Sequence, residues 1–128
     1  MSRPQVFTTR REDTDYLAIY IPYGRFDRED HNLFMRAALA LGENLALLIK
    51  KHLDYGPRNI ADFGELGVLV RLNDKVQRLR HILASGKQPA NEAIEDTWRD
   101  IANYGLIGYL VRMGYWPGME VKHEQEKE

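Results

Sequence analysis

Apolar residues recur every three or four positions along three stretches of the chain, and this spacing predicts three long helices. The first runs from about residue 30 to about residue 52, the second over about 63–84 and the third over about 91–112. Asn91 is a candidate N-cap for the third. Turn-forming segments that contain Gly and Pro follow the helices, at residues 54–59, 85–89 and 115–118. Three helices of this length favour an all-α helical bundle.

The N-terminal part of the chain lacks this helical spacing. Residues 1–16 are polar, and we expect them to form an extended or loosely ordered arm. Residues 16–21 are aromatic and β-branched, which favours one strand or an arm laid on a neighbour. One strand cannot make a sheet by itself. We therefore expect an N-terminal arm over residues 1–30, a helical domain over 31–114 and a charged tail over 115–128.

The charges of the chain are nearly balanced, with 18 basic and 19 acidic residues and a formal net charge of −1. Such a balance produces no strong field toward nucleic acid or a lipid surface, so we expect neither as a direct partner. The absence of cysteine excludes disulfides and thiolate metal sites. The longest apolar run, Ala37 to Gly42, is far shorter than a membrane span. We expect a soluble, cytoplasmic protein.

Three carboxylates in the third predicted helix, Glu92, Asp96 and Asp100, are spaced four residues apart, and Asn103 follows on the same stripe. The opposite side carries the apolar residues that we expect to face a core: Ile94, Trp98 and Ile101. Carboxylates on one face repel each other unless a cation lies among them, and divalent cations prefer oxygen ligands. The alternative is a solvated acidic face, with Glu92 suited to the helix dipole. The spacing alone does not decide between them.

The second predicted helix carries Arg71, Asp74, Lys75 and Arg78 on one charged face. A short connection makes the second and third helices antiparallel neighbours, so Asp74 can add a carboxylate to the acidic stripe. The three basic side chains can bind phosphate oxygens. The alternative is a set of surface ion pairs, each of which contributes little to stability.

The first predicted helix ends in Asp54, Tyr55 and Gly56. Tyr55 can stack on a planar base, and Asp54 can accept a hydrogen bond from it. By chemistry alone, an ordinary helix end with a Gly terminator is the better interpretation. The four histidines have no ligand-like spacing, and no Walker or Rossmann glycine motif is present.

Three sequence blocks in this order carry a resemblance to a known family. They are residues 51–56 (KHLDYG), residues 71–79 (RLNDKVQRL) and residues 92–104 (EAIEDTWRDIANY). Together they resemble the family called nucleotide modification associated domain 1, a former domain of unknown function common in bacteriophages and bacteria. The resemblance covers about residues 45–112. This family is distantly similar to the all-α nucleoside triphosphate pyrophosphatases of the MazG and dimeric dUTPase types.

The resemblance implies a MazG-like helical fold and a Mg²⁺-dependent pyrophosphohydrolase. Its substrate would be a (deoxy)nucleoside triphosphate, and its products a monophosphate and pyrophosphate. The implied metal ligands are Asp74, Glu92, Asp96 and Asp100, with Glu92 and Asp96 as the catalytic pair. The implied phosphate-binding residues are Arg71, Lys75 and Arg78, and those near sugar or base are Asp54, Tyr55 and Asn103. The wide apolar surface of the first helix and the pyrophosphatase resemblance together lead us to expect a homodimer.

One departure from the MazG pattern keeps a second hypothesis open. The first two predicted helices have no E-x-x-E pair, and Asp74 is the only carboxylate inside the second, with Glu65 near its start. The third helix has E-x-x-x-D in place of E-x-x-D. A non-catalytic module that binds a nucleotide, or docks on a phage or host protein, is therefore the alternative. A structural helical dimer with solvated charged stripes is the third hypothesis.

Overall fold

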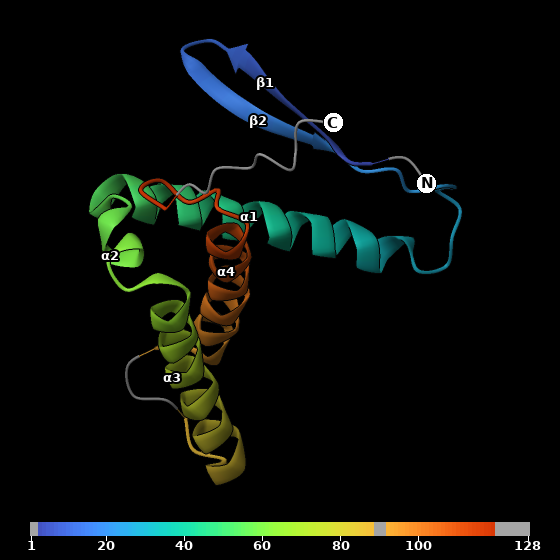
Figure 1. Cartoon of the computed structure of the whole chain (residues 1–128). Helices are drawn as coiled ribbons and strands as arrows, with labels where there is room; N and C mark the ends of the chain where they lie inside the picture. The colour runs from blue at the N-terminus through green and yellow to red at the C-terminus, as the bar shows by residue number, and fades with distance from the viewer. Residues whose placement is uncertain (1–2, 89–91, 120–128) are drawn as a thin grey trace. The chain divides into compact units, whose positions relative to one another are not determined.

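The structure is a computed structural model that describes residues 3–88 and 92–119. The chain divides into two compact units, Met1–Ala38 and Leu39–Glu128, and each is described here by itself. Figure 1 labels the elements in chain order: β1 (Gln5–Arg11), β2 (Thr14–Tyr20), α1 (His31–Tyr55), α2 (Arg58–Ala61), α3 (Gly64–Ser85) and α4 (Ile94–Arg112).

The first unit contains a two-stranded antiparallel sheet, so the expectation of an all-α fold is wrong. β1 pairs with β2 along its whole length, from Gln5 opposite Tyr20 to Arg11 opposite Thr14. The strands are joined by a tight turn in which Glu12 has a φ of 56°, in the left-handed region. The arm predicted over residues 1–30 is therefore largely a hairpin.

The sequence does not predict β1, because this strand lies within residues 1–16, which we expected to be loosely ordered. Its centre, residues 6–9, consists of the β-branched and aromatic residues that suit a strand. The rings of Phe7 and Tyr20 pack edge-on at 5.1 Å between centroids, and Arg10 pairs with Asp15 at 2.7 Å. The turn has no Gly or Asn, which are the residues that mark a tight hairpin in a sequence.

In the second unit, α3 and α4 lie side by side and run in opposite directions (Figure 1). The direction follows from their contacts, because Glu65 pairs with Arg112 while Arg78 binds Thr97. α3 ends at Gly86, whose φ of 69° gives the left-handed terminator that glycine favours. The predicted cap Asn91 lies outside the described residues, and the N-cap of α4 is Ala93. The long helices thus lie close to the predicted ranges, and the short helix α2 is an addition to them.

The core of the second unit is made by α2, α3, α4 and the segment that follows α4. Its buried apolar residues are Ile60, Val68, Ile107, Val111 and Trp116. The Trp116 indole donates a hydrogen bond from Nε1 to the carbonyl oxygen of Pro57, at 3.0 Å. This bond ties the chain after α4 to the start of α2.

The buried face of α4 is not the one that we expected. Trp98 is 56 % exposed, whereas Thr97 beside it is 0 % exposed, and Ile94 and Ile101 are only partly buried. The buried positions of α4 are Thr97, Asn103, Ile107 and Val111. The face of α4 that packs on α3 therefore carries polar residues near its N-terminus and apolar residues near its C-terminus.

None of the 25 residues of α1 is buried. Within the second unit, α1 contacts α4 through three polar interactions. Glu43 accepts a hydrogen bond from Arg99 at 3.0 Å, the Asn44 carbonyl oxygen accepts one from Asn103 at 3.1 Å, and Lys51 forms an ion pair with Asp100 at 3.6 Å. By length and composition alone, α1 is long and apolar enough to cross a membrane. A buried core helix and a signal sequence near an N-terminus pass the same test. The three contacts with α4 join the C-terminal part of α1 to the other helices of the second unit.

Candidate functional site

Four charged residues of α3, α4 and the segment before α4 form the charged cluster: Lys75, Arg78, Glu92 and Asp100. The Lys75 ammonium lies 2.9 Å from Asp100 Oδ2 and 3.3 Å from Glu92 Oε2. Arg78 donates one hydrogen bond to Thr97 Oγ1 at 2.8 Å and another to the Glu92 carbonyl oxygen at 2.9 Å. Each charged group of the cluster therefore has a partner of opposite charge or a hydrogen-bond acceptor.

The helices explain how this cluster forms. Lys75 and Arg78 are three residues apart, so they project from the same face of α3. Glu92 precedes α4, which begins at Ile94, so its backbone carbonyl is free to accept from Arg78. Asp100 comes one turn after the buried Thr97. The cluster thus joins the two helices near the N-terminal end of α4.

Proton affinities in the cluster follow from these contacts. The hydrogen bond to Asp100 raises the pKa of Lys75 above its ordinary value, although partial burial opposes the shift. Burial acts to raise the pKa of Asp100. The hydrogen bond from Lys75 and the charges of Lys51 and Lys75 together outweigh it, so the pKa of Asp100 lies below its ordinary value. At neutral pH the Lys75–Asp100 pair is therefore held in its ionised form.

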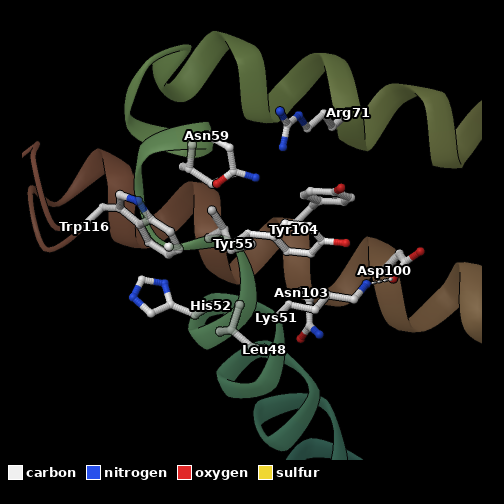
Figure 2. Close-up of a pocket in the computed structure, with 13 residues that line it drawn as sticks. Leu48, Lys51, His52, Tyr55, Asn59, Arg71, Asp100, Asn103, Tyr104 and Trp116 are labelled. Carbon is white, nitrogen blue, oxygen red and sulfur yellow. Dashed lines mark ion pairs between the residues drawn. The ribbon is translucent and has the colours of Figure 1, made fainter.

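A pocket of about 310 Å³ lies beside this cluster, between the C-terminal part of α1, α2, α3 and α4 (Figure 2). Its aromatic lining consists of His52, Tyr55, Tyr104 and Trp116. Its polar lining consists of Lys51, Asn59, Arg71, Asp100 and Asn103, and its aliphatic lining of Leu48, Ile60 and Ile107, with Gly56. A volume near 300 Å³ is at the lower end of the range for small-molecule sites.

Two of the polar residues that line the pocket are fixed by their neighbours. The Asn103 amide donates to the carbonyl oxygen of Asn44, which orients the amide group. Asp100 belongs to both the cluster and the pocket, because its Oδ1 lies 3.6 Å from Lys51 Nζ, the ion pair drawn in Figure 2. The cluster therefore holds one wall of the pocket.

Lys51, Lys75 and Arg78 pair with carboxylates, whereas among the described residues Arg71 does not. Its guanidinium lies 6.0 Å from the centroid of the Phe63 ring, and in the described part of the chain it makes no ion pair with a carboxylate. In Figure 2 this guanidinium is directed from α3 toward the pocket. A partly buried cation without a carboxylate partner is suited to binding an anion.

The aromatic wall has two kinds of member. Trp116 is buried, donates to Pro57, and packs edge-on against His52 with ring centroids 5.4 Å apart. These two rings build the wall. Tyr55 is exposed and Tyr104 half-buried, so their rings are accessible to a planar ligand.

The structure brings together some of the predicted site residues and separates others. Those that line the pocket are Tyr55, Arg71, Asp100 and Asn103. Those that join the charged cluster with Asp100 are Lys75, Arg78 and Glu92. Those that are exposed, with no side-chain hydrogen bond or ion pair to any described residue, are Asp54, Asp74 and Asp96.

The separation of Asp96 from Glu92 has a geometric cause. The four-residue spacing places both on one stripe only if both are helical, but α4 begins at Ile94 and leaves Glu92 in the preceding segment. Glu92 reaches back to Lys75, whereas Asp96 lies in the first turn of α4 and faces solvent. The implied catalytic pair is therefore not assembled in the described structure.

The implied metal ligands do not form a ready-made cation site. Among residues 3–88 and 92–119, no group of three or more His, Asp or Glu side chains is close enough to hold a metal ion. Of the four implied ligands only Glu92 and Asp100 come together, and the Lys75 ammonium bridges them. The residues present do not fit a Mg²⁺ ion held by protein ligands alone.

Sequence reasoning did not identify several residues of the pocket: Lys51, His52, Asn59, Tyr104 and Trp116. Lys51 and His52 open the first block that resembles the family, and Tyr104 closes the third, so their place in those blocks was a usable signal. The sequence around Trp116 indicates only the turn that follows the third predicted helix. Trp116 lines the pocket because the chain after α4 folds back to Pro57, and no local sequence pattern predicts this contact.

Residues 51–112, just under half of the chain, match the model of the family described as nucleotide modification associated domain 1. This supports the family resemblance proposed from the three sequence blocks, and the matched segment contains most of the pocket and the whole charged cluster. No curated protein and no solved structure matches the chain.

Proposed function

We propose that the pocket beside the charged cluster binds a nucleotide. The observation that carries this proposal is the Arg71 guanidinium, which lies at the pocket without a carboxylate partner in the described structure and close to two accessible tyrosine rings. A cation beside aromatic faces is the combination that a phosphate attached to a planar base requires. The family match over residues 51–112 supports the same ligand class by its description.

The parts of the nucleotide are assigned by chemistry. The phosphate would meet Arg71, whose planar fork suits phosphate oxygens, and the base would stack on Tyr55 or Tyr104. The amide groups of Asn59 and Asn103 would hydrogen-bond the sugar or the base edge. Lys75 and Arg78 would support the wall of the pocket without binding the phosphate, because both already contact residues of α4.

The reaction that we propose is the hydrolysis of a (deoxy)nucleoside triphosphate to a monophosphate and pyrophosphate, assisted by Mg²⁺. It rests on the distant likeness to MazG-type and dimeric dUTPase-type pyrophosphatases. Of the four implied ligands, Glu92 and Asp100 are adjacent, and the Lys75 ammonium lies between them, so these residues by themselves do not supply the metal site that this reaction requires. The closed cluster favours the alternative, a module that binds a nucleotide without turning it over.

A ligand panel tests the proposal. The purified chain is titrated with nucleosides and with nucleoside mono-, di- and triphosphates, with and without Mg²⁺, while the midpoint of thermal unfolding and the release of pyrophosphate are measured. A nucleotide at about 100 times its Kd stabilises the fold by about 2.7 kcal/mol, a readily measured shift. Stabilisation with pyrophosphate release supports the hydrolase, and stabilisation without it supports the binding module. The absence of any shift across the panel contradicts both.

We also propose that the protein is a homodimer. On α1, Leu39 is 66 % exposed and Leu53 is 78 % exposed, and the helix has no buried residue. An exposed apolar surface of this kind is typical of a protein interface. Sedimentation equilibrium should give twice the chain mass, and L39E combined with L53E should give monomers. A monomeric wild-type chain at micromolar concentration contradicts this proposal.

A further inference from the structure

We propose that the pocket recognises one phosphate group, so that its ligand is a nucleoside monophosphate or the monophosphate part of a longer nucleotide. This inference rests on the proposed nucleotide site and specifies its ligand. It follows from the cations that surround the pocket and from what each of them already binds.

The charged residues that line the pocket are Lys51, Arg71 and Asp100. Two cations and one carboxylate leave a single net positive charge on the lining, with His52 counted as neutral. A phosphate monoester carries about −1.5 to −2 charges at neutral pH, which this lining can balance together with solvent. Each further phosphoryl group adds negative charge, and the lining offers no further cation for it.

The two cations of the adjoining charged cluster, Lys75 and Arg78, are already bound within it. Lys75 lies within 3.3 Å of both Asp100 and Glu92, and Arg78 donates to the buried Thr97 hydroxyl. If Lys75 moved to a phosphate, it would leave two adjacent carboxylates without their shared cation, a costly arrangement in a partly buried site. A β- or γ-phosphate would therefore gain little from these two side chains.

Lys51 and Arg71 are the cations left for the ligand. The Lys51 ion pair with Asp100 is long, at 3.6 Å, and the Lys51 side chain is 52 % exposed, so Lys51 can turn to a phosphate at small expense. Arg71 makes no ion pair within the described residues. The pocket volume of about 310 Å³ also suits a small ligand of one base, one sugar and one phosphate.

The test compares affinities along a phosphate series. Isothermal titration calorimetry of the full chain in EDTA uses thymidine, dTMP, dTDP and dTTP, and the matching deoxyguanosine series. The expected result is a gain of about 10- to 100-fold from nucleoside to monophosphate, the effect of charge-assisted hydrogen bonds. The di- and triphosphates should then bind within about 3-fold of the monophosphate, a difference under 1 kcal/mol.

Arg71→Gln should abolish the gain from nucleoside to monophosphate, while Arg71→Lys should keep part of it. The control is Arg80→Gln, an exposed arginine of the same helix that is not part of the pocket, which should leave the series unchanged. Urea unfolding of each variant checks that the fold is intact.

A triphosphate that binds more than 10-fold tighter than the monophosphate in EDTA would overturn the inference while leaving the nucleotide site in place. The same conclusion follows if the monophosphate gain survives in Arg71→Gln. If no member of either series binds, the proposed nucleotide site itself fails, and this inference fails with it.

Discussion

The charged cluster and the pocket both contain basic side chains of α3 and residues of α4. The basic side chains of the cluster have close partners, whereas, in the described part of the chain, Arg71 at the pocket does not. In the cluster, Lys75 and Arg78 each contact partners on or just before α4 at 2.8 to 3.3 Å. One turn away on α3, Arg71 has no carboxylate partner among the described residues. Paired charges hold elements together, whereas an unpaired cation at a pocket is available to a ligand. We therefore expect Lys75 and Arg78 to stabilise the fold and Arg71 to bind the ligand.

Arg78→Ala is expected to have the largest effect on stability. It removes the donor to Thr97 Oγ1, which is buried, and to the Glu92 carbonyl oxygen. Leaving a buried acceptor unpaired and an ion pair broken costs about 2–4 kcal/mol. Urea unfolding measures this loss, and Arg80→Ala is the control because Arg80 is exposed on the same helix. A change smaller than about 0.5 kcal/mol would show that the cluster does not hold α3 and α4 together.

Lys75→Met is expected to destabilise the fold by about 1–3 kcal/mol, because Glu92 and Asp100 then lose the cation that they share and keep only their longer ion pairs with Arg78 and Lys51. The same change should allow a divalent ion to take the place of the ammonium. Thermal unfolding with Mn²⁺ and with EDTA measures this: the variant should be stabilised by Mn²⁺ and the wild type should not. Lys50→Met is the control, since Lys50 is exposed and not part of the cluster. If Mn²⁺ stabilises the wild type as much as the variant, the Lys75 ammonium does not keep a divalent ion from binding between Glu92 and Asp100.

The sequence predicted α3 and α4 well because both carry a sustained apolar period and end at turn residues. The sequence also predicted antiparallel packing of α3 and α4, since a short connection between two helices implies it. The α3 residues that meet Glu92 and Asp100 are Lys75 and Arg78, whereas Asp74, which we expected there, is exposed. The error lay in the start of α4. A three-residue shift places Glu92 before the helix and so removes it from the stripe that Asp96 and Asp100 share.

The hairpin and the pocket could not be derived from local patterns. β1 and β2 stabilise each other only as a pair, and neither has the marked alternation or the Gly-containing turn that identifies a hairpin. The pocket combines residues of α1, α2, α3, α4 and the segment after α4, so it depends on how the helices pack and on the hydrogen bond from Trp116 to Pro57. Trp98, an apolar residue expected in the core, is exposed because the polar residues of α4 face α3.

The free energy of unfolding at acid pH should depend on the ionisation of Asp100. Its pKa is depressed in the folded state, so its contribution to stability is present above the unfolded pKa of about 3.9 and is lost as pH falls through the lower folded value. Urea unfolding measured from pH 6 down to pH 3 should show a decline that Asp100→Asn makes shallower. The pKa of Lys75 is raised, so its contribution is lost only at alkaline pH, above about 10.4. An unchanged acid limb in Asp100→Asn would mean that the ion pair with Lys75 adds no pH-dependent stability.

The ion pair between Glu65 and Arg112 joins the same two helices as the cluster, but on their exposed surface, and it should have the smallest effect. The two side chains are 52 % and 75 % exposed and lie 3.3 Å apart. Exposed pairs contribute about 0–1 kcal/mol, because water competes for both groups and salt screens them. Glu65→Gln should therefore change the free energy of unfolding by less than 1 kcal/mol, and the change should vanish in about 1 M NaCl. A loss as large as that of Arg78→Ala would mean that the contact between α3 and α4 depends on charge along its whole length, and the division between cluster and surface would have to be abandoned.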